Sequence, residues 1–205
     1  MPHKRIALTG GIATGKTTVA NRLRELGAII LDADQYARQA VEPGAPSHDA
    51  LRRIIGARYF DAHGTLRRDE LRRRIIRDPA LRARIDAVLH PYIMRAMGIE
   101  WEKQKSLHPR AVIVFDIPLL FEGGLDKNFD IIILAYCTHE VQLQRLIERD
   151  KLDPSEAELT LSMQFPIDSK RAHSNYIIEN SGDLDQTLRQ VDEVWDKILE
   201  RQSSN

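Results

Sequence analysis

The sequence predicts an α/β fold: an open, five-stranded parallel sheet with helices on both faces. Five short runs are apolar at every or nearly every position, which is typical of parallel strands that are buried on both faces. Helical patterns separate these runs along the chain. A chain that alternates strands with helices forms a parallel sheet with right-handed crossovers.

The first elements form a strand–helix–strand unit within about thirty residues. Ile6-Ala7-Leu8 is the first strand and leads into a glycine turn. Residues 16–26 carry apolar side chains at helical spacing until Gly27 ends the helix. Residues 28–31 then form a second all-apolar strand.

Residues 35–108 follow a different pattern, because they show helical periodicity and no strong strand signal. The helical pattern breaks at residues 43–46, 61–64 and 78–79. We therefore expect a helical insertion carried on the sheet. Eight arginines lie between residues 67 and 84, and we expect most of them on a solvated helix face, with one or two directed at an anionic ligand.

The remaining chain supplies three more strands and the helices between them. The expected strands are residues 111–116, 131–135 and 176–178, and the expected helices are 139–150, one that begins at 153–156, and 184–201. Only the tail at residues 202–205 is expected to be disordered.

The composition is that of an ordinary soluble protein. The chain has 205 residues, of which 42% are hydrophobic and 29% charged, which fits one domain of ordinary size. Thirty basic and thirty acidic residues give a net charge of zero, which argues against binding nucleic acid or a membrane by bulk charge. The single cysteine, Cys137, excludes an intrachain disulfide, and we find neither an apolar run of membrane-spanning length nor a signal peptide. We expect a cytoplasmic protein.

The most specific motif is Gly10-Gly11-Ile12-Ala13-Thr14-Gly15-Lys16-Thr17, which matches G-x-x-x-x-G-K-[ST]. Its glycines let the backbone curl so that N–H groups face phosphate oxygens. Lys16 then reaches the β- and γ-phosphates, and the Thr17 hydroxyl ligates Mg²⁺. Chance produces such a match on the order of 0.01 times in a chain of this length. The motif predicts a bound nucleoside triphosphate and leaves the second substrate open.

Acidic residues end two of the expected strands, at the edge where ligands bind in such sheets. Asp32 and Asp34 follow the second strand, and we expect one to cap the next helix and the other to act on Mg²⁺ or on an attacking hydroxyl. Asp116 ends the third strand and resembles a Walker B acid that binds Mg²⁺. Residues 118–122 then either line a pocket or pack in the core.

Gln142, Arg145 and Arg149 share one face of a predicted helix. Beside a triphosphate, an arginine neutralises charge that develops on the transferred phosphoryl group. The alternative is a helix face with a salt bridge to Glu148, and the residues alone leave both readings open.

The pattern as a whole resembles the dephospho-coenzyme A kinases over nearly the full length. Besides the motif and its preceding Leu8-Thr9, the resemblance rests on Asp32-Ala33-Asp34, Arg38 with Val41-Glu42-Pro43-Gly44, Leu89-His90-Pro91, residues 117–122, residues 142–146, Gln164, Lys170-Arg171 and residues 178–182. The chain departs from the family at Ala13-Thr14, where Gly-Ser is more usual. Thr is a fair substitute for Ser, and Ala narrows the backbone freedom slightly.

The resemblance implies an enzyme, dephospho-CoA kinase, which transfers phosphate from ATP to the 3′-hydroxyl of dephospho-coenzyme A in the last step of coenzyme A synthesis. It implies a P-loop core (residues 1–34, 109–141 and 174–205), a helical coenzyme A-binding insertion (35–108) and a helical lid (142–173). ATP and dephospho-coenzyme A are the expected partners, with Mg²⁺ as cofactor and with no nucleic acid or membrane. The expected assembly is a monomer or a weak homo-oligomer.

The expected site residues fall into four groups. The catalytic residues are Asp34, Lys16 and Arg145; the ATP-binding residues are Gly11, Ile12, Ala13, Thr14, Gly15, Lys16, Thr17, Thr18, Arg145, Arg149, Asn180 and Gly182; the acceptor-binding residues are Asp34, Arg38, His90, Leu119, Phe121, Glu122, Gln164 and Arg171; and the metal ligands are Thr17 and Asp116. By the resemblance, Asp34 meets the substrate hydroxyl, while Asn180 and Gly182 border the adenine of ATP.

Two other functions remain open from the residues. One is a kinase of nucleoside monophosphates or of another small acceptor. The other is a nucleotide-operated switch without turnover. ADP release that requires an added acceptor distinguishes a kinase from a switch, and the identity of the acceptor distinguishes the kinases.

Overall fold

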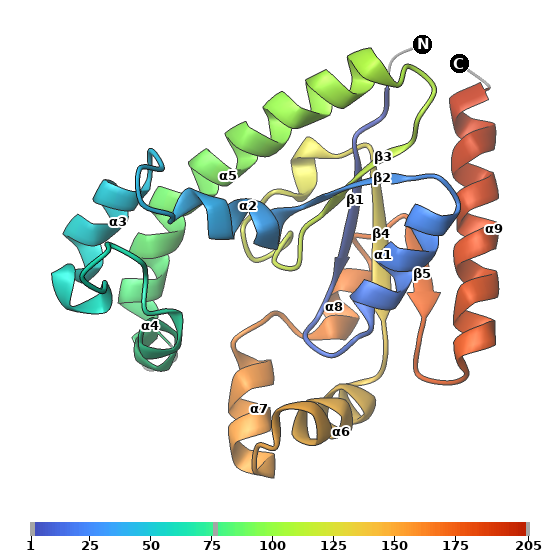
Figure 1. Ribbon diagram of the computed structural model, residues 1–205. Helices are drawn as coiled ribbons and strands as arrows, with labels where there is room; N and C mark the ends of the chain where they lie inside the picture. Colours follow the sequence, from blue (N-terminus) through green and yellow to red (C-terminus); the bar gives the residue numbers. More distant parts are fainter. Residues whose placement is uncertain (1–2, 76–77, 204–205) are drawn as a thin grey trace. The chain divides into compact units, whose positions relative to one another are not determined.

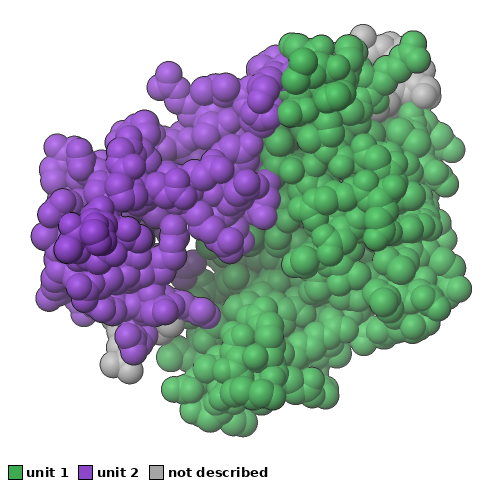
Figure 2. Space-filling view, in the orientation of Figure 1, with its two compact units in different colours: residues 1–31, 104–205 green, residues 32–103 purple. Residues whose placement is uncertain are grey.

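The computed structural model describes residues 3–75 and 78–203. One of the eight arginines, Arg77, and the last two residues of the tail lie outside this range. The chain divides into two compact units, residues 1–31 with 104–205 (unit 1) and residues 32–103 (unit 2), coloured separately in Figure 2. No helix among the described residues is long and apolar enough to cross a membrane.

Five parallel strands form one sheet in the order β2-β3-β1-β4-β5, which confirms the predicted fold class (Figure 1). The strands are β1 (Ile6–Gly10), β2 (Ile29–Asp32), β3 (Ile113–Asp116), β4 (Ile131–Tyr136) and β5 (Tyr176–Glu179). Ile6 at the start of β1 lies opposite Val114 of β3 and Ile131 of β4. Because the strands are parallel, the carboxyl ends of β1 and β3 lie at the same edge of the sheet, where Asp116 is opposite Leu8, two residues before Gly10.

Two helices cover one face of the sheet. They are α1 (Lys16–Glu25) and α9 (Leu184–Ser203), and α9 extends two residues into the tail that we expected to be disordered. Leu23 of α1 and Ile198 of α9 are fully buried in one apolar cluster with the alternate strand residues Ile6, Leu8 and Ile133. This cluster anchors α1, so the glycine turn before α1 is held between two buried elements.

The opposite face of the sheet carries α8 (Ile167–Arg171), whose Ile167 packs on Leu134 and Tyr136 of β4. Two further helices, α6 (His139–Asp150) and α7 (Pro154–Ser162), follow β4. Their N-caps are Thr138 and Asp153, whose side-chain oxygens accept from backbone N–H groups of the first turn. The α6 and α7 helices share a small apolar core of Leu146, Ala157 and Leu161, which is separate from the core of the sheet.

Unit 2 is built from helices, as the periodicity predicts. They are α2 (Ala33–Ala40), α3 (His48–Ile55), a short 3₁₀ turn η1 (Ala57–Tyr59), α4 (Arg68–Ile75) and most of α5 (Pro79–Leu107). A second 3₁₀ turn, η2 (Asp126–Asn128), lies in unit 1. Unit 2 has a core of its own, which includes Leu51, Ile55, Phe60 and Ile85. The roles assigned to residues 35–108 and 142–173 stay predictions.

Candidate active site

The turn between β1 and α1 requires glycine at three positions, for steric reasons. A Cβ at Gly10 would lie 2.6 Å from Thr14 Oγ1, and one at Gly11 would lie 2.5 Å from Gln142 Nε2. Gly15 adopts a left-handed φ of 83°, and a Cβ there would overlap the amide of Asn180. The glycines of the motif thus let neighbouring groups approach the backbone closely enough to shape the loop.

Thr14 closes the loop from inside. Its backbone N–H and its hydroxyl both donate to the Gly11 carbonyl, at 3.3 and 2.8 Å, while its own carbonyl accepts from Asn180 Nδ2 at 2.8 Å. Ala13, where the family more often has glycine, adopts a left-handed φ of 60°. That conformation costs a residue with a Cβ about 1–2 kcal/mol, so this departure from the family pattern restricts the backbone more than expected.

The loop leaves the amino end of α1 open. The N-cap is Gly15, which forms no side-chain cap hydrogen bond, so the first N–H groups of the helix keep their capacity for an anion. Lys16 lies at this end and forms an ion pair with Asp116 at the end of β3. The two side chains are only 15% and 6% exposed. A cationic and a carboxylate group therefore stand together where β1 and β3 end.

The two expected metal ligands differ in exposure. Thr17 is exposed in the first turn of α1, whereas Asp116 is buried. Hydroxyl and carboxylate oxygens are the ligands that Mg²⁺ prefers, and Mg²⁺ in kinases takes only one or two protein side chains and completes its shell with phosphates and water. The donor set of this site thus fits Mg²⁺ bound together with a triphosphate.

The three residues that we predicted to share one face of α6 have different surroundings in the structure. Gln142 is buried, and its Nε2 donates to the Ile12 carbonyl at 2.7 Å. Arg149 is exposed and forms two hydrogen bonds with Asp150, at 2.7 and 2.9 Å. Arg145 has no carboxylate partner among the described residues, and its Nη1 lies 3.9 Å from the point where a Cβ of Gly15 would stand. This placement favours the phosphate-facing reading for Arg145 and the salt-bridged reading for Arg149, with Asp150 in place of Glu148.

Arg145 also lies beside Cys137, the residue that follows β4. The thiol is fully buried and its Sγ lies 3.8 Å from the Ala13 carbonyl. Burial raises the pKa of Cys137 to about 11, against the opposing influence of the Arg145 charge. The thiol is therefore protonated at neutral pH and is a packing group behind the loop.

The loop after β3 contains three expected acceptor-binding residues. Leu119 and Phe121 are half-buried, and the Phe121 ring lies 6.1 Å from the His173 ring. Glu122 Oε1 accepts from Lys170 Nζ at 2.7 Å and from the Phe165 N–H at 3.0 Å, whereas its Oε2 is buried and has no hydrogen-bond partner in the described part of the chain. Glu122 is thus tied to α8 in this structure.

Two more expected acceptor-binding residues flank that ion pair. Gln164 Oε1 accepts from the Ile12 N–H at 2.9 Å, which places Gln164 on the phosphate-binding loop. Arg171 is exposed, and its guanidinium lies over the Tyr136 ring at 4.6 Å from the centroid.

The expected adenine-bordering residues differ from each other. Asn180 is buried, and its amide is shared between the Thr14 carbonyl and the Thr187 hydroxyl. Gly182 is exposed, and the nearest group to a Cβ there would be Gln186 Oε1, at 3.9 Å. Asn180 braces the loop from behind, which the sequence does not indicate.

Three expected site residues, Asp34, Arg38 and His90, belong to unit 2, and Asp32 precedes them at the start of α2. The Asp32 side chain caps α2 by accepting from the Asp34 N–H at 2.9 Å, so one of the two aspartates is the cap, as expected. Asp34 is exposed on the first turn of α2. Arg38 is also exposed, and its carbonyl accepts from Arg68 Nη2 at 3.2 Å, while His90 is half-buried on α5.

Sequence reasoning missed the contacts that hold the loop in place. Lys170 has a fully buried side chain, although a lysine in a short polar helix reads as a surface residue. Gln142 and Gln164 both contact Ile12, but nothing in their spacing indicates a shared partner. The nearest signal is that both lie in segments that resemble the family.

Comparisons with known proteins identify the family. The family model described as dephospho-CoA kinase matches residues 4–186. The chain belongs to the dephospho-CoA kinase family. Members of this family catalyse the last step of coenzyme A biosynthesis, and the chain is accordingly a P-loop kinase.

Individual relatives cover nearly the whole chain. A dephospho-CoA kinase of Leifsonia xyli is 37% identical over 190 residues, which are 93% of this chain and 96% of that protein. One of Anaeromyxobacter dehalogenans is 42% identical over 178 residues, or 86% of this chain and 83% of that protein. A crystal structure of a Thermus thermophilus protein superposes with a TM-score of 0.78 at 30% identity, covering 96% of this chain and 98% of that one.

Proposed function

We propose that this chain transfers the γ-phosphoryl group of ATP to the 3′-hydroxyl of dephospho-coenzyme A. The observation that carries the ATP half is the turn between β1 and α1. Neighbouring groups leave no room for side chains at its glycines, the N-cap of its helix is a glycine that has no side chain to cap the helix, and Lys16 is the next residue. The acceptor half rests on membership of the dephospho-CoA kinase family.

Lys16 and Asp116 exchange partners when ATP binds. In the free protein their charges satisfy each other inside the site. The β- and γ-phosphates offer Lys16 several anionic oxygens and withdraw it from Asp116. With Lys16 withdrawn, Asp116 and Thr17 would hold Mg²⁺, which would neutralise charge on the phosphate oxygens.

The transfer step places Asp34 at the acceptor. The 3′-oxygen forms a bond to the γ-phosphorus while the bond from that phosphorus to the β,γ-bridging oxygen breaks, and ADP leaves. The hydroxyl proton passes to the Asp34 carboxylate, whose exposed position on the first turn of α2 leaves it accessible to a ligand. Arg145, which lacks a carboxylate partner among the described residues, stabilises the charge on the transferred group.

The other expected site residues are assigned to the two substrates as follows. Gly11 to Thr18 and Gly182 serve ATP, with Asn180 behind the loop, and Arg38, His90, Leu119, Phe121 and Arg171 serve the acceptor. Arg149, Glu122 and Gln164 hold protein partners instead: Asp150, Lys170 and Ile12 respectively. We propose that the reaction takes place in the cytoplasm, which agrees with a chain whose single cysteine cannot form an intrachain disulfide. A monomer or a weak homo-oligomer is the assembly we propose.

An assay of ADP release tests this function. The purified chain is given ATP and Mg²⁺ with dephospho-coenzyme A, with AMP, with CMP, or with no acceptor. We expect release only with dephospho-coenzyme A. Equal release with AMP or CMP would instead indicate a nucleoside monophosphate kinase, and binding of ATP without any acceptor-dependent release would indicate a switch.

A further inference from the structure

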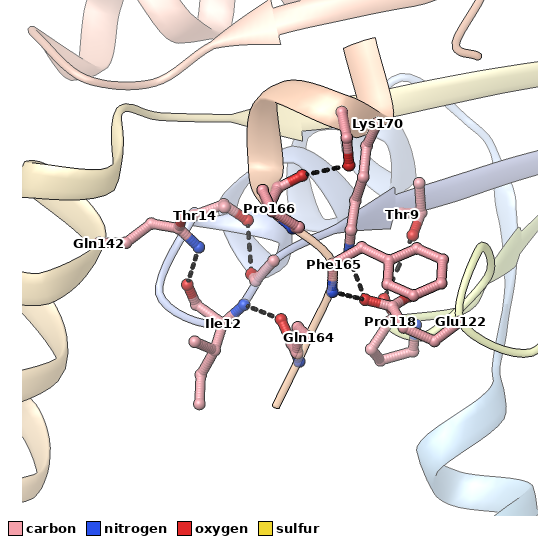
Figure 3. Close-up of polar contacts among 12 residues, drawn as sticks. Thr9, Ile12, Thr14, Pro118, Glu122, Gln142, Gln164, Phe165, Pro166 and Lys170 are labelled. Carbon is pink, nitrogen blue, oxygen red and sulfur yellow. Dashed lines mark hydrogen bonds and ion pairs between the residues drawn. The ribbon is translucent and has the colours of Figure 1, made fainter. Parts of the chain in front are cut away.

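Both backbone polar groups of Ile12, its N–H and its carbonyl, are held by glutamine side chains (Figure 3). Gln164 Oε1 accepts from the Ile12 N–H at 2.9 Å, and Gln142 Nε2 donates to the Ile12 carbonyl at 2.7 Å. The two glutamines come from α6 and from the segment between α7 and α8, and both belong to the expected lid, residues 142–173. An N–H needs an acceptor and a carbonyl needs a donor, so these partners fix which amide atom each glutamine presents.

Packing ties the same point of the loop to the α6–α7 pair. The side chains of Ile12 and Ala13 pack against the apolar cluster of Leu146, Ala157 and Leu161. Gln142 is 4% exposed and leaves no room for a Cβ on Gly11. The tip of the loop is thus part of the packing of these two helices.

A second connection begins one residue after Gln164. The Phe165 N–H and the Lys170 amine both donate to Glu122 Oε1, and the Lys170 side chain is fully buried. Glu122 lies in the loop that follows Asp116. The segment from Gln164 to Lys170 therefore contacts Ile12 through Gln164, and it contacts the loop after β3 through Phe165 and Lys170.

Fixing Ile12 controls where the following N–H groups point. The Thr14 hydroxyl and N–H close back on the Gly11 carbonyl, so residues 11–14 form one rigid turn around Ile12. A rotation of either peptide group beside Ile12 would rotate this turn and misdirect the backbone donors that meet the phosphates. Neither glutamine needs to touch the nucleotide to affect its binding.

We propose that Gln142 and Gln164 are positioning residues that clamp the Ile12 backbone, one through its N–H and the other through its carbonyl, and so orient the phosphate-binding loop, coupling it to the α6–α7 helices. The proposal rests on the ATP half of the proposed function and is independent of the acceptor. It assigns opposite hydrogen-bonding roles to two residues of the same type. Gln142 must donate, whereas Gln164 only needs to accept.

This difference predicts opposite responses to one substitution. Gln164→Glu keeps an acceptor for the Ile12 N–H, but Gln142→Glu sets a carboxylate against the Ile12 carbonyl. Gln142→Ala removes the hydrogen bond to the Ile12 carbonyl, and Gln164→Ala removes the hydrogen bond to the Ile12 N–H. Gln144→Glu adds the same charge to α6 at an exposed position, where Gln144 bonds only Glu148 among the described residues, and it serves as the control.

The experiment measures the Kd of Mg²⁺-ADP for the full chain by calorimetry, in salt of about 0.3 M, where exposed charges are largely screened. Loss of one hydrogen bond weakens such binding about fivefold, so we expect this for Gln142→Ala and Gln164→Ala. The Kd of Mg²⁺-ADP for Gln164→Glu should lie within about twofold of the Kd for Gln144→Glu. Gln142→Glu should bind Mg²⁺-ADP no more tightly than Gln142→Ala does, because a carboxylate cannot donate to the Ile12 carbonyl. Thermal unfolding without nucleotide identifies any variant that is not folded.

Two results would overturn the clamp: Glu and Ala giving the same Kd at position 164, or both Ala variants binding ADP like the wild type. If the buried Gln142 variants do not fold, the pair at the half-buried position 164 decides alone. Failure of the proposed function looks different. In that case the wild type binds ADP with the expected pattern among its variants, yet does not turn over dephospho-coenzyme A.

Discussion

Gly15→Ala tests whether the loop has the shape described. Gly15 is the N-cap of α1 and adopts a φ of 83°, a conformation that residues with a Cβ rarely take. The added methyl group would overlap Asn180 Nδ2, which donates to the Thr14 carbonyl. The substitution therefore strains the backbone and also pushes the buried amide from its partner.

The expected loss of stability follows from these two effects. The left-handed conformation costs alanine about 1–2 kcal/mol, and loss of the Asn180 hydrogen bond inside the protein costs about 1–2 kcal/mol. A smaller conformational entropy of the unfolded chain returns about 0.4–1 kcal/mol. The free energy of unfolding should fall by about 2–3 kcal/mol, which lowers Tm by about 5–10 °C for a chain of this size.

Thermal unfolding followed by circular dichroism measures this change, and Gly98→Ala is the matched control. Gly98 lies inside α5, where nothing is within 4 Å of an added Cβ and φ is not positive. Alanine there should raise the free energy of unfolding by up to about 1 kcal/mol. A Gly15→Ala protein within 0.5 kcal/mol of wild type, on the order of an ordinary surface change, would refute the described loop.

Three further predictions concern the chemistry. Lys16→Ala should fold and lose most ATP-dependent turnover; a folded variant within about threefold of the wild-type rate would contradict the role of Lys16. Arg145→Lys keeps the charge but loses the planar fork, so steady-state kinetics should show a fall in kcat larger than the rise in KM for ATP, and a change in KM alone would mean ground-state binding only. Asp34→Asn should lower kcat by about 10²-fold with little change in ATP affinity, whereas Asp32→Asn should be milder in turnover; the reverse order in assays at saturating substrates would exchange their roles.

The sequence predicts the sheet well, because its three central strands β1, β3 and β4 are buried on both faces. All six residues of β4 are buried, and the run of apolar residues in the sequence predicts this burial directly. The phosphate-binding loop is also readable, since glycines at fixed spacing are required by close contacts. The Asp32 cap follows from local chemistry between residues two positions apart.

The parts that the sequence does not reveal depend on how distant segments meet. Gln142 and Gln164 read as ordinary polar residues, because only the packing of α6 and α7 against the loop brings both to Ile12. Lys170 reads as a surface residue, since its burial depends on Glu122 arriving from the loop after β3. Such contacts join residues far apart along the chain, and the hydrophobic periodicity of the sequence does not predict them.

Identifying the phosphorylated product tests the central claim most directly. The chain is incubated with ATP, Mg²⁺ and dephospho-coenzyme A, and the product is examined by mass spectrometry and phosphorus NMR. We predict that the acceptor gains one phosphoryl group, that this group is on the ribose 3′-oxygen, and that one ADP forms for each. Unchanged dephospho-coenzyme A in the presence of a folded, ATP-binding protein, or a phosphoryl group at another position, would contradict the account.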